Sequence, residues 1–362
     1  MKKIFSVALA ATLLAAGCQK TEIINRVGDA IGFNAELSKL TKASDAANEG
    51  MLNLQQQNFK VWAYTAYEDA TNGIEPGKVY DNMEALPVTY SNNAWGTTLR
   101  YYWPGENRSL DFFAVSTGAT YAVEGQEAGE NTPAVEGISV VITGMGDANL
   151  GGRTLKVNDY TVVNTNPNDD LMVAEFVRQH QQQNGKNVDL KFKHALSRVI
   201  FKFKTKAPSN ENEIAPEVVI NSLSVADLSV SGDLTVTEKT AAAAGTEDSD
   251  GTRAQVDLEW ALDEAVANFA DDYDGALTLT TAAQDFTTWL VMPQTLAGKK
   301  VTIDYTIDGR GFQTAFLLGT DTVTSWGINQ SITYTVTLAP NVITFVPSVE
   351  DWEVVNDESM TN

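Results

Sequence analysis

The chain has 362 residues, and 43% of them, with seven tryptophans, are hydrophobic, so it holds enough apolar material for two packed cores. Its formal net charge is −22 at pH 7. Proteins that bind nucleic acid neutralise phosphates with clustered Lys and Arg, and because the sequence has no such cluster we expect no nucleic acid as a partner. The acidity fits either a soluble, highly charged surface or cation binding by carboxylates.

Residues 1–18 are typical of a lipoprotein signal peptide. Lys2 and Lys3 precede an apolar run at 4–16, too short for a mature membrane-spanning helix, and small residues lead directly to Cys18. Cys18 is the sole cysteine, and its setting resembles the bacterial lipobox, in which the thiol is acylated. We therefore expect an exported chain that acyl groups on Cys18 hold to the outer membrane, without disulfides or cysteine-ligated metal. The alternative is an ordinary secretory peptide with an incidental cysteine.

Residues 19–58 are expected to form a tether, one separable strand and a linker. The strand is predicted at 31–37, where apolar and polar side chains alternate. Three basic residues in the flanking polar sequence are candidate sites for proteolytic processing, because a protease can reach an extended backbone there: Arg26, Lys39 and Lys42. Cleavage after Lys39 or Lys42 would free the strand, whereas cleavage at Arg26 would leave it attached. The bond between Lys42 and Ala43 is the site we favour.

Residues 59–186 are predicted to form an N-terminal β-sandwich. Short strands rich in aromatic residues alternate with Gly, Pro and Asn turn clusters, a pattern typical of a sandwich rather than of alternating βαβ units. The predicted strands lie at 59–64, 87–90, 99–103, 109–115 and 138–142. One helix is predicted between residues 170 and 183, because Met172 and Phe176 lie four residues apart after an Asp-Asp pair that could cap it.

Residues 187–362 are predicted to form a C-terminal β-sandwich. Alternation is clearest at 188–204, where Val199, Phe201 and Phe203 share one face of the expected strand. We predict that these three side chains and that of Leu196 lie in a core. Residues 301–307 and 331–338 alternate in the same way. Helical spacing of apolar residues at 258–269 predicts a short amphipathic helix.

The search for catalytic or metal-binding motifs yields little. His180 and His194 lie far apart, with no second His or Cys at ligand spacing, so we predict no zinc site. The glycine cluster at 144–149 lacks the third glycine of a dinucleotide loop and is interpreted as a turn, and residues 271–275 only faintly resemble a calcium loop because no Glu follows at the required distance. With 47 Asp and Glu, a pair of carboxylates suited to glycoside hydrolysis has no specificity. We expect no enzyme activity and no cofactor.

Several sequence strings occur in an order that resembles the fimbrillin family of the Bacteroidales. After the lipobox at Cys18 and the separable strand at 31–37 come FKVWAY at 59–64, LKFKHALSRV at 190–199, MPQT at 292–295, WGINQSITY at 326–334, ITF at 343–345 and VEDW at 349–352. Each string is weak alone, and their order over almost the whole chain carries the resemblance.

The resemblance implies an all-β fold, with two transthyretin-like β-sandwich domains in tandem and a few short helices, and a structural or adhesive pilus subunit. In such proteins a lipoprotein precursor reaches the cell surface, a trypsin-like protease removes the first strand, and the groove that remains accepts a strand of another subunit. Partners would be other fimbrial subunits and a receptor on a host or bacterial surface. The alternatives are a tethered lipoprotein that binds glycan or host protein without polymerising, and a secreted hydrolase.

Residues 341–362 carry too many apolar side chains for a solvated tail. Residues 343–346 could form the last strand of the second domain. Residues 349–355 are the candidate donor strand for a neighbouring subunit, with Val349, Trp352 and Val354 as the apolar residues that would enter its groove.

Overall fold

The structure is a computed structural model, and it describes residues 29–37, 54–56, 58–66, 75–104, 108–117, 138–146, 152–162, 170–180, 187–208, 214–239, 253–265, 267–339 and 342–352. Most of this backbone is β-strand and hardly any of it is helical, which confirms the predicted all-β class. Among these residues, helical backbone occurs only at 54–56.

The strands fall into five sheets. In chain order they are β1 (Gly32–Leu37), β2 (Phe59–Thr65), β3 (Leu86–Ser91), β4 (Ala94–Gly96), β5 (Ser109–Ser116), β6 (Ser139–Thr143), β7 (Thr154–Thr161), β8 (Met172–Ala174), β9 (Phe176–His180), β10 (Asn187–His194), β11 (Ser197–Thr205), β12 (Val218–Leu228), β13 (Ser231–Glu238), β14 (Arg253–Ala254), β15 (Val256–Leu262), β16 (Ala267–Thr278), β17 (Gln284–Val291), β18 (Gln294–Thr295), β19 (Lys300–Ile307), β20 (Arg310–Leu317), β21 (Ser325–Trp326), β22 (Gln330–Ala339) and β23 (Val342–Asp351).

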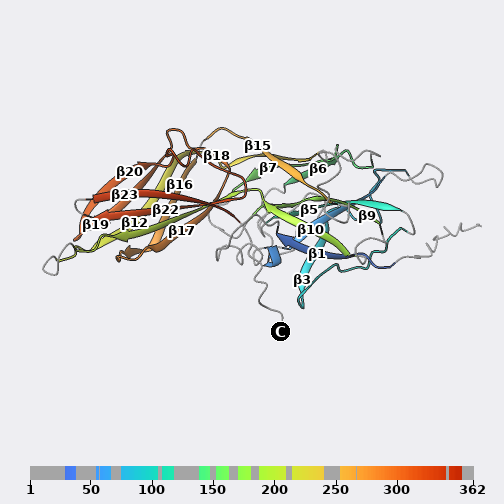
Figure 1. Ribbon diagram of the computed structural model, residues 1–362, viewed down its shortest axis with the longest axis horizontal. Coiled ribbons are helices and arrows are strands. Elements are labelled where there is room, and N and C mark those ends of the chain that lie inside the picture. The colour runs from blue at the N-terminus through green and yellow to red at the C-terminus, as the bar shows by residue number, and fades with distance from the viewer. Residues whose placement is uncertain are drawn as a thin grey trace, which may run out of the picture.

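A nine-stranded sheet with the main order β1-β10-β8-β5-β2-β3-β4 forms the N-terminal half, and outside this order β9 pairs with β5 and β14 pairs with β9. The sheet curls, since Ala30, which precedes β1, forms an isolated antiparallel bridge with Tyr102, which lies beyond β4 in the chain. The inner face encloses an apolar core that includes Phe59, Phe112 and Phe192. On the outer side, the sheet β15-β13-β7-β6 packs against the nine-stranded one (Figure 1).

Strand β5 shows how the sequence fits this arrangement. It lies between two cores, so both of its faces are buried and its sequence, SLDFFAVS, is almost continuously apolar. Phe112 faces the inner core, and Phe113 faces the core shared with the four-stranded sheet. The charged exception is Asp111, which is also fully buried.

The C-terminal half is a sandwich of two four-stranded sheets, β17-β11-β22-β23 and β16-β12-β19-β20 (Figure 1). The clean alternation of β11, β19 and β22 places every second side chain in the core between the sheets. The four core residues predicted on the 188–204 segment, Leu196, Val199, Phe201 and Phe203, are all fully buried, so that prediction is confirmed. Strands at 301–307 and 331–338 are confirmed as β19 and β22.

Two predicted helices are wrong. Residues 170–183 contain β8 and β9, and residues 258–269 contain parts of β15 and β16.

The division expected between residues 186 and 187 does not coincide with a boundary between sheets. Strand β10 begins at Asn187 but pairs with β1 and β8, and β13 pairs with β7. Strands β10 and β13 follow residue 186 in the chain but pair with strands of the N-terminal sheets. The spacing of residues along the chain does not reveal such long-range pairing.

Candidate functional site

The predicted separable strand is present as β1, at one end of the nine-stranded sheet. It pairs in parallel with β10, in a register that places Phe33 opposite Val188, Ala35 opposite Leu190 and Leu37 opposite Phe192. Parallel neighbours that are so far apart in the chain need a long connection, and here about 150 residues lie between them. Within the part of the chain that the structure describes, β10 is the one full strand that pairs with β1.

The inward side chains of β1 are deeply buried although the strand is at an edge. Ile31 is 7% exposed, and Phe33 and Leu37 are each 4% exposed. The Phe33 ring meets Phe112 edge-to-face at 6.2 Å, and Phe112 meets Trp103 in the same way at 5.8 Å. Burying each such side chain stabilises a fold by about 1.5–3 kcal/mol, so removal of β1 would leave a strongly apolar groove.

On the side of β1 away from β10, the backbone hydrogen bonds involve a short segment at the start of the strand. The Ile31 amide donates to the Tyr101 carbonyl oxygen at 2.8 Å, and the Trp103 amide donates to the Asp29 carbonyl oxygen at 3.1 Å. Burial, together with the negative charge of Asp81, raises the pKa of Tyr101, so its hydroxyl stays neutral beside this strand. On the outer face, Asn34 Nδ2 donates to Asp189 Oδ1 at 2.6 Å.

The predicted C-terminal strand at 343–346 is confirmed as part of β23, which runs antiparallel to β22 at the edge of its sheet. Of the three donor candidates, Val349 lies in β23 and is 41% exposed, whereas Trp352 is buried within its own chain at 3% exposure. Its indole stacks on the imidazole of His194. Val354 lies outside the described residues.

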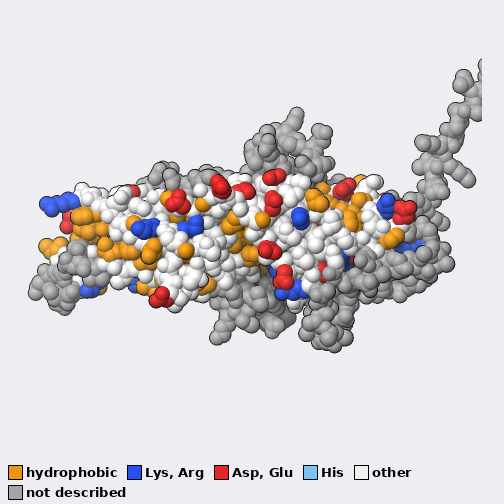
Figure 2. Space-filling view, turned by 90° about the horizontal axis from the view of Figure 1, so that it is seen from above, with side chains coloured by type: hydrophobic (Ala, Val, Ile, Leu, Met, Phe, Trp, Pro, Cys, Tyr) orange, Lys and Arg blue, Asp and Glu red, His pale blue; other side chains and the backbone are white. Residues whose placement is uncertain are grey.

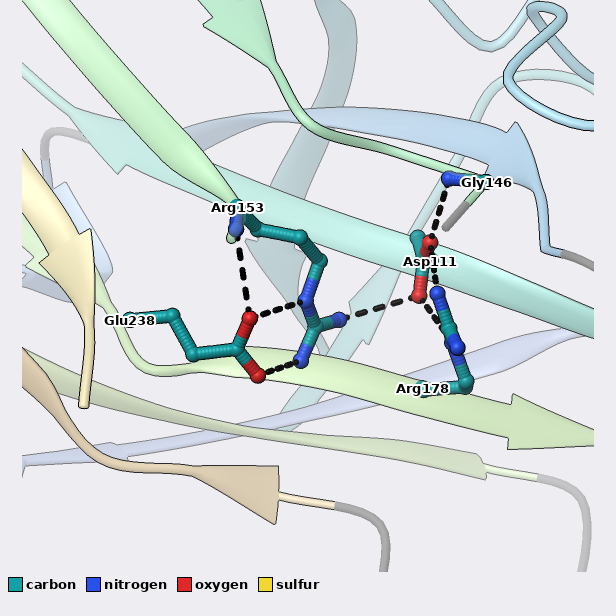
Figure 3. Close-up of polar contacts among 5 residues, drawn as sticks. All are labelled: Asp111, Gly146, Arg153, Arg178 and Glu238. Atoms are coloured by element: carbon teal, nitrogen blue, oxygen red, sulfur yellow. Dashed lines mark hydrogen bonds and ion pairs between the residues drawn. The ribbon is translucent and has the colours of Figure 1, made fainter. Parts of the chain in front are cut away.

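A buried network of charges joins the nine-stranded sheet to the β15-β13-β7-β6 sheet (Figure 3). Arg153 lies between two carboxylates, with Nη1 2.9 Å from Asp111 Oδ1 and Nη2 2.7 Å from Glu238 Oε1. Arg178 donates to both oxygens of Asp111, and the Gly146 amide also donates to it, at 3.2 Å. Two positive and two negative side chains balance, so the pairing offsets much of the cost of burying them.

The network was not predicted from the sequence, although one signal was available. Asp111 interrupts a strand that is otherwise apolar on both faces, and a buried carboxylate requires a charged or hydrogen-bonding partner. The predicted glycine turn contributes the Gly146 amide to the network. Gly144 and Gly146 have positive φ values of 75° and 80°, which glycine adopts without strain. The network has no opening to solvent at Arg153 or Asp111, so it is suited to holding two sheets together rather than to catalysis.

The remaining predicted residues are placed as follows. Cys18, Arg26, Lys39 and Lys42 lie outside the described residues. His194 lies at the end of β10 beside Asp170, and His180 lies at the end of β9. The acidic 271–275 segment is not a loop, because its backbone belongs to β16.

Within the described residues, no group of three or more His, Cys, Asp or Glu side chains is arranged to hold a metal ion. None of the helical backbone in those same residues has the length and apolar character needed to cross a membrane.

The model of the fimbrillin-like family matches residues 41–352, which is most of the chain. The chain belongs to the fimbrillin-like family. The resemblance noted from the sequence is therefore confirmed. No curated protein sequence matches this fimbrillin-like chain.

Solved structures of low sequence identity resemble this fimbrillin-like protein. A fimbrial protein from Bacteroides vulgatus is 18% identical, has a TM-score of 0.50, and the match covers 89% of this chain and 99% of that one. A proposed cell adhesion protein from Bacteroides uniformis is 14% identical with a TM-score of 0.46, over 89% of this chain and 98% of that one. The first of these likenesses supports the all-β fold.

Proposed function

We propose that this fimbrillin-like protein is a structural or adhesive subunit of a cell-surface fimbria, and that it assembles when a strand of one subunit replaces β1 of the next. The observation that carries the proposal is the contrast within β1. Its inward side chains are as buried as core residues, yet one parallel strand and one short segment hold its backbone. A strand of this kind can be replaced without unfolding the rest of the sheet.

Removal of β1 would expose two complementary features. The free edge of β10 would present unpaired amides and carbonyl groups, and the inner core would present Phe112, Trp103 and the alternating apolar side chains of β10. A strand from another copy satisfies both, because it supplies ladder hydrogen bonds and side chains at every second position. Donor and acceptor are different surfaces, so the contact is head-to-tail, and it extends into a fibre when the rotation between copies does not close a ring.

In this proposal the precursor is a lipoprotein held by Cys18, and cleavage after Lys42 frees β1. The partners are other fimbrial subunits, and the place of action is the outer surface of the cell. The family membership of the chain and the edge position of β1 support this sequence of events.

A disulfide that fixes β1 to β10 tests the proposal. Asn34 and Asp189 face each other across the β1–β10 pair with their side chains in hydrogen-bond contact, so Asn34→Cys with Asp189→Cys should form a disulfide in the full-length precursor. Cells that produce this variant should process the precursor but make no fibres under oxidising conditions, and reductant should restore them.

Each single-cysteine variant is the matched control and should assemble normally. Intact-mass analysis of the surface protein adds a second readout, in which a start at Ala43 accompanies fibres. Normal fibres from the disulfide-locked variant, or a surface protein that starts at acylated Cys18 and forms no fibres, would contradict the proposal. The second result would favour a tethered binding protein.

A further inference from the structure

We infer that two copies of this chain pair side by side through strand β20, antiparallel and about a two-fold axis at Thr314, so that their sheets join into one continuous sheet. Strand β20 is the last strand of the sheet β16-β12-β19-β20, and among the described residues only β19 pairs with it. The inference goes beyond the proposed function, because it uses a different edge from that of β1 and requires no strand to be removed.

The sequence of β20 leaves its edge open to pairing. Edge strands are commonly protected by charged residues, proline or a bulge. The sequence RGFQTAFL has no acidic residue and no proline, its one charge is Arg310 at the start, and its register with β19 is unbroken. The other long edge strands carry acidic residues such as Asp271, Asp285 and Asp351. In a chain with a net charge of −22, β20 is therefore the long edge at which two copies repel each other least.

Apolar side chains are exposed on both faces of β20. Phe312 is 45% exposed and lies against Tyr305, with ring centroids 5.7 Å apart, on the side that faces the other sheet of the sandwich. Leu317 is 51% exposed and points to the opposite side, because side chains alternate along a strand. Figure 1 places β20 at the upper side of the C-terminal sandwich, and Figure 2, seen from above, shows hydrophobic side chains at the surface of this part of the molecule. A partner that covers these side chains gains apolar burial.

The ladder with β19 determines which backbone groups of β20 point outward. The Leu318 amide donates to the Lys299 carbonyl oxygen at 2.9 Å, one step beyond the pair of Lys300 with Leu317. Hydrogen-bonded and non-hydrogen-bonded pairs alternate along an antiparallel ladder, so the even-numbered residues of β20 bond to β19. The amides and carbonyl groups of the odd-numbered residues point away from β19: Gly311, Gln313, Ala315 and Leu317.

These outward groups select the register of the pair. In an antiparallel pair of two β20 strands, residues with outward backbone groups must lie opposite each other. An axis at Thr314 satisfies all four of them, because Gly311 lies opposite Leu317 of the second copy and Gln313 lies opposite Ala315. An axis at residue 313 would leave Leu317 opposite a residue outside β20, and an axis at residue 315 would do the same to Gly311.

Side chains are also self-complementary in this register. On the side that faces the other sheet, Phe312 lies opposite Phe316 of the second copy, and such aromatic cross-strand pairs stabilise antiparallel strands. On the opposite side, Leu317 lies opposite Gly311. No atom lies within 4 Å of the position that a Cβ of Gly311 would take, so there is room for the leucine side chain. Both exposed apolar side chains of β20 therefore gain a partner.

The contact is small, so one pair of subunits should bind weakly. Residues 311–317 of each copy form it, whereas a standard stable interface uses about 20–30 residues on each side. In a fibre, many copies of β20 would lie along one polymer, and several weak contacts together give a much higher avidity. Under the proposed function, pairing of β20 would thus join fibres side by side. Only this last step rests on the proposed function.

Disulfide trapping of the purified chain tests the pairing and its register. In a Cys18→Ser background the introduced cysteine is the sole thiol. Thr314→Cys should give a covalent dimer on oxidation, because the two residues at the axis form a non-hydrogen-bonded pair, in which Cβ atoms lie closest. Gln313→Cys and Ala315→Cys are the matched controls and should give at least tenfold less dimer. A dimer that is strongest at residue 313 or 315 would overturn the register, and no dimer at any of the three would overturn the pairing.

A charge at the same edge gives a second test without cysteines. Ala315→Glu places an acidic side chain beside the axis in both copies, and Ala315→Gln has nearly the same shape without the charge. Residue 315 is exposed, so both variants should fold. In analytical ultracentrifugation the average mass of wild type and of Ala315→Gln should rise with concentration, and that of Ala315→Glu should not. In electron microscopy, fibres of Ala315→Glu should form but should not bundle.

The outcomes separate this inference from the proposed function. Equal self-association of Ala315→Glu and Ala315→Gln would overturn the pairing through β20, whether or not fibres form. A wild-type chain that makes no fibres, while Thr314→Cys still gives the covalent dimer, would count against the proposed function and would support the pairing.

Discussion

The indole of Trp352 stacks on the imidazole of His194, with ring centroids 3.7 Å apart and an interplanar angle of 5°. His194 is the last residue of β10, the strand that holds β1, and Trp352 directly follows β23. Asp170 fixes the imidazole through a contact of 2.5 Å between its Oδ2 and His194 Nδ1, and the Trp352 amide donates to the Asn329 carbonyl oxygen at 2.9 Å. The end of the last strand is thus attached to the N-terminal sheet.

This contact predicts that Trp352→Ala lowers the stability of the fold. The substitution removes a buried aromatic side chain and should lower the free energy of unfolding of the precursor by about 3 kcal/mol, measured by urea denaturation. Trp352→Phe retains a ring for stacking and is the control. Unchanged stability of the Trp352→Ala variant would contradict this role.

The buried charge network predicts that removal of one member is costly. Arg153→Met preserves much of the side-chain volume but leaves Glu238 as a buried carboxylate without its guanidinium partner, so stability should fall by about 3–5 kcal/mol. Glu238→Gln leaves Arg153 with Asp111 and should cost less. Urea denaturation of both single variants and of the double variant measures the coupling. If the two losses simply add, Arg153 and Glu238 do not act as a pair.

The strands that the sequence predicts well have one buried face. In β11 and β22 polar and apolar residues alternate because one face meets the other sheet and one face is more exposed. The same reasoning found β1 from only seven residues. Where both faces are buried, as in β8 and β9, the alternation is lost, and an even spacing such as that of Met172 and Phe176 fits a strand as well as a helix.

The second wrong helix has a different cause. In β15, Leu258, Trp260 and Leu262 form a partly buried row with the period of a strand. Ala261 and Ala265 complete a helical pattern only if alanine counts as apolar, and in the structure both are exposed. The partners of Arg153 in the charge network could not be predicted from local patterns, because Asp111 and Glu238 lie 42 and 85 residues from it along the chain. Only the paired sheets bring them together.

Tyr334 predicts how stability depends on alkaline pH. Burial raises its pKa to about 12, although the hydrogen bond from Trp326 partly opposes the shift. In the unfolded chain the hydroxyl ionises near the ordinary tyrosine pKa of 10.0. The folded state therefore binds the proton more tightly than the unfolded state. The resulting contribution to the free energy of unfolding is fully present below about pH 10 and is lost as the pH rises toward 12. Urea denaturation at a series of pH values should show this decline.

Tyr334→Phe is the control for that profile. It should lower stability at neutral pH, because Trp326 Nε1 and the Leu318 carbonyl oxygen lose their partner, but it should make the alkaline decline less steep. Some decline should remain, since burial and Glu84 also raise the pKa of Tyr64 to about 12. An unchanged slope in Tyr334→Phe would show that this hydroxyl is not a source of the pH dependence.

Processing after Lys42 predicts a difference between two neighbouring lysines. A trypsin-like protease requires a basic side chain before the bond that it cleaves, so Lys42→Ala should leave β1 covalently attached and reduce fibres at least tenfold. Lys42→Arg should process normally, because it keeps the charge. Lys39→Ala is the matched control, since it removes the other basic residue between β1 and residue 43 without touching the favoured bond. Gel mobility and intact mass of the surface protein measure both outcomes.

If Lys42→Ala matures and assembles like wild type while Lys39→Ala does not, the cleavage follows Lys39. If both mature normally and the double variant fails, either bond is sufficient to free β1, and the groove rather than the exact processing site governs assembly.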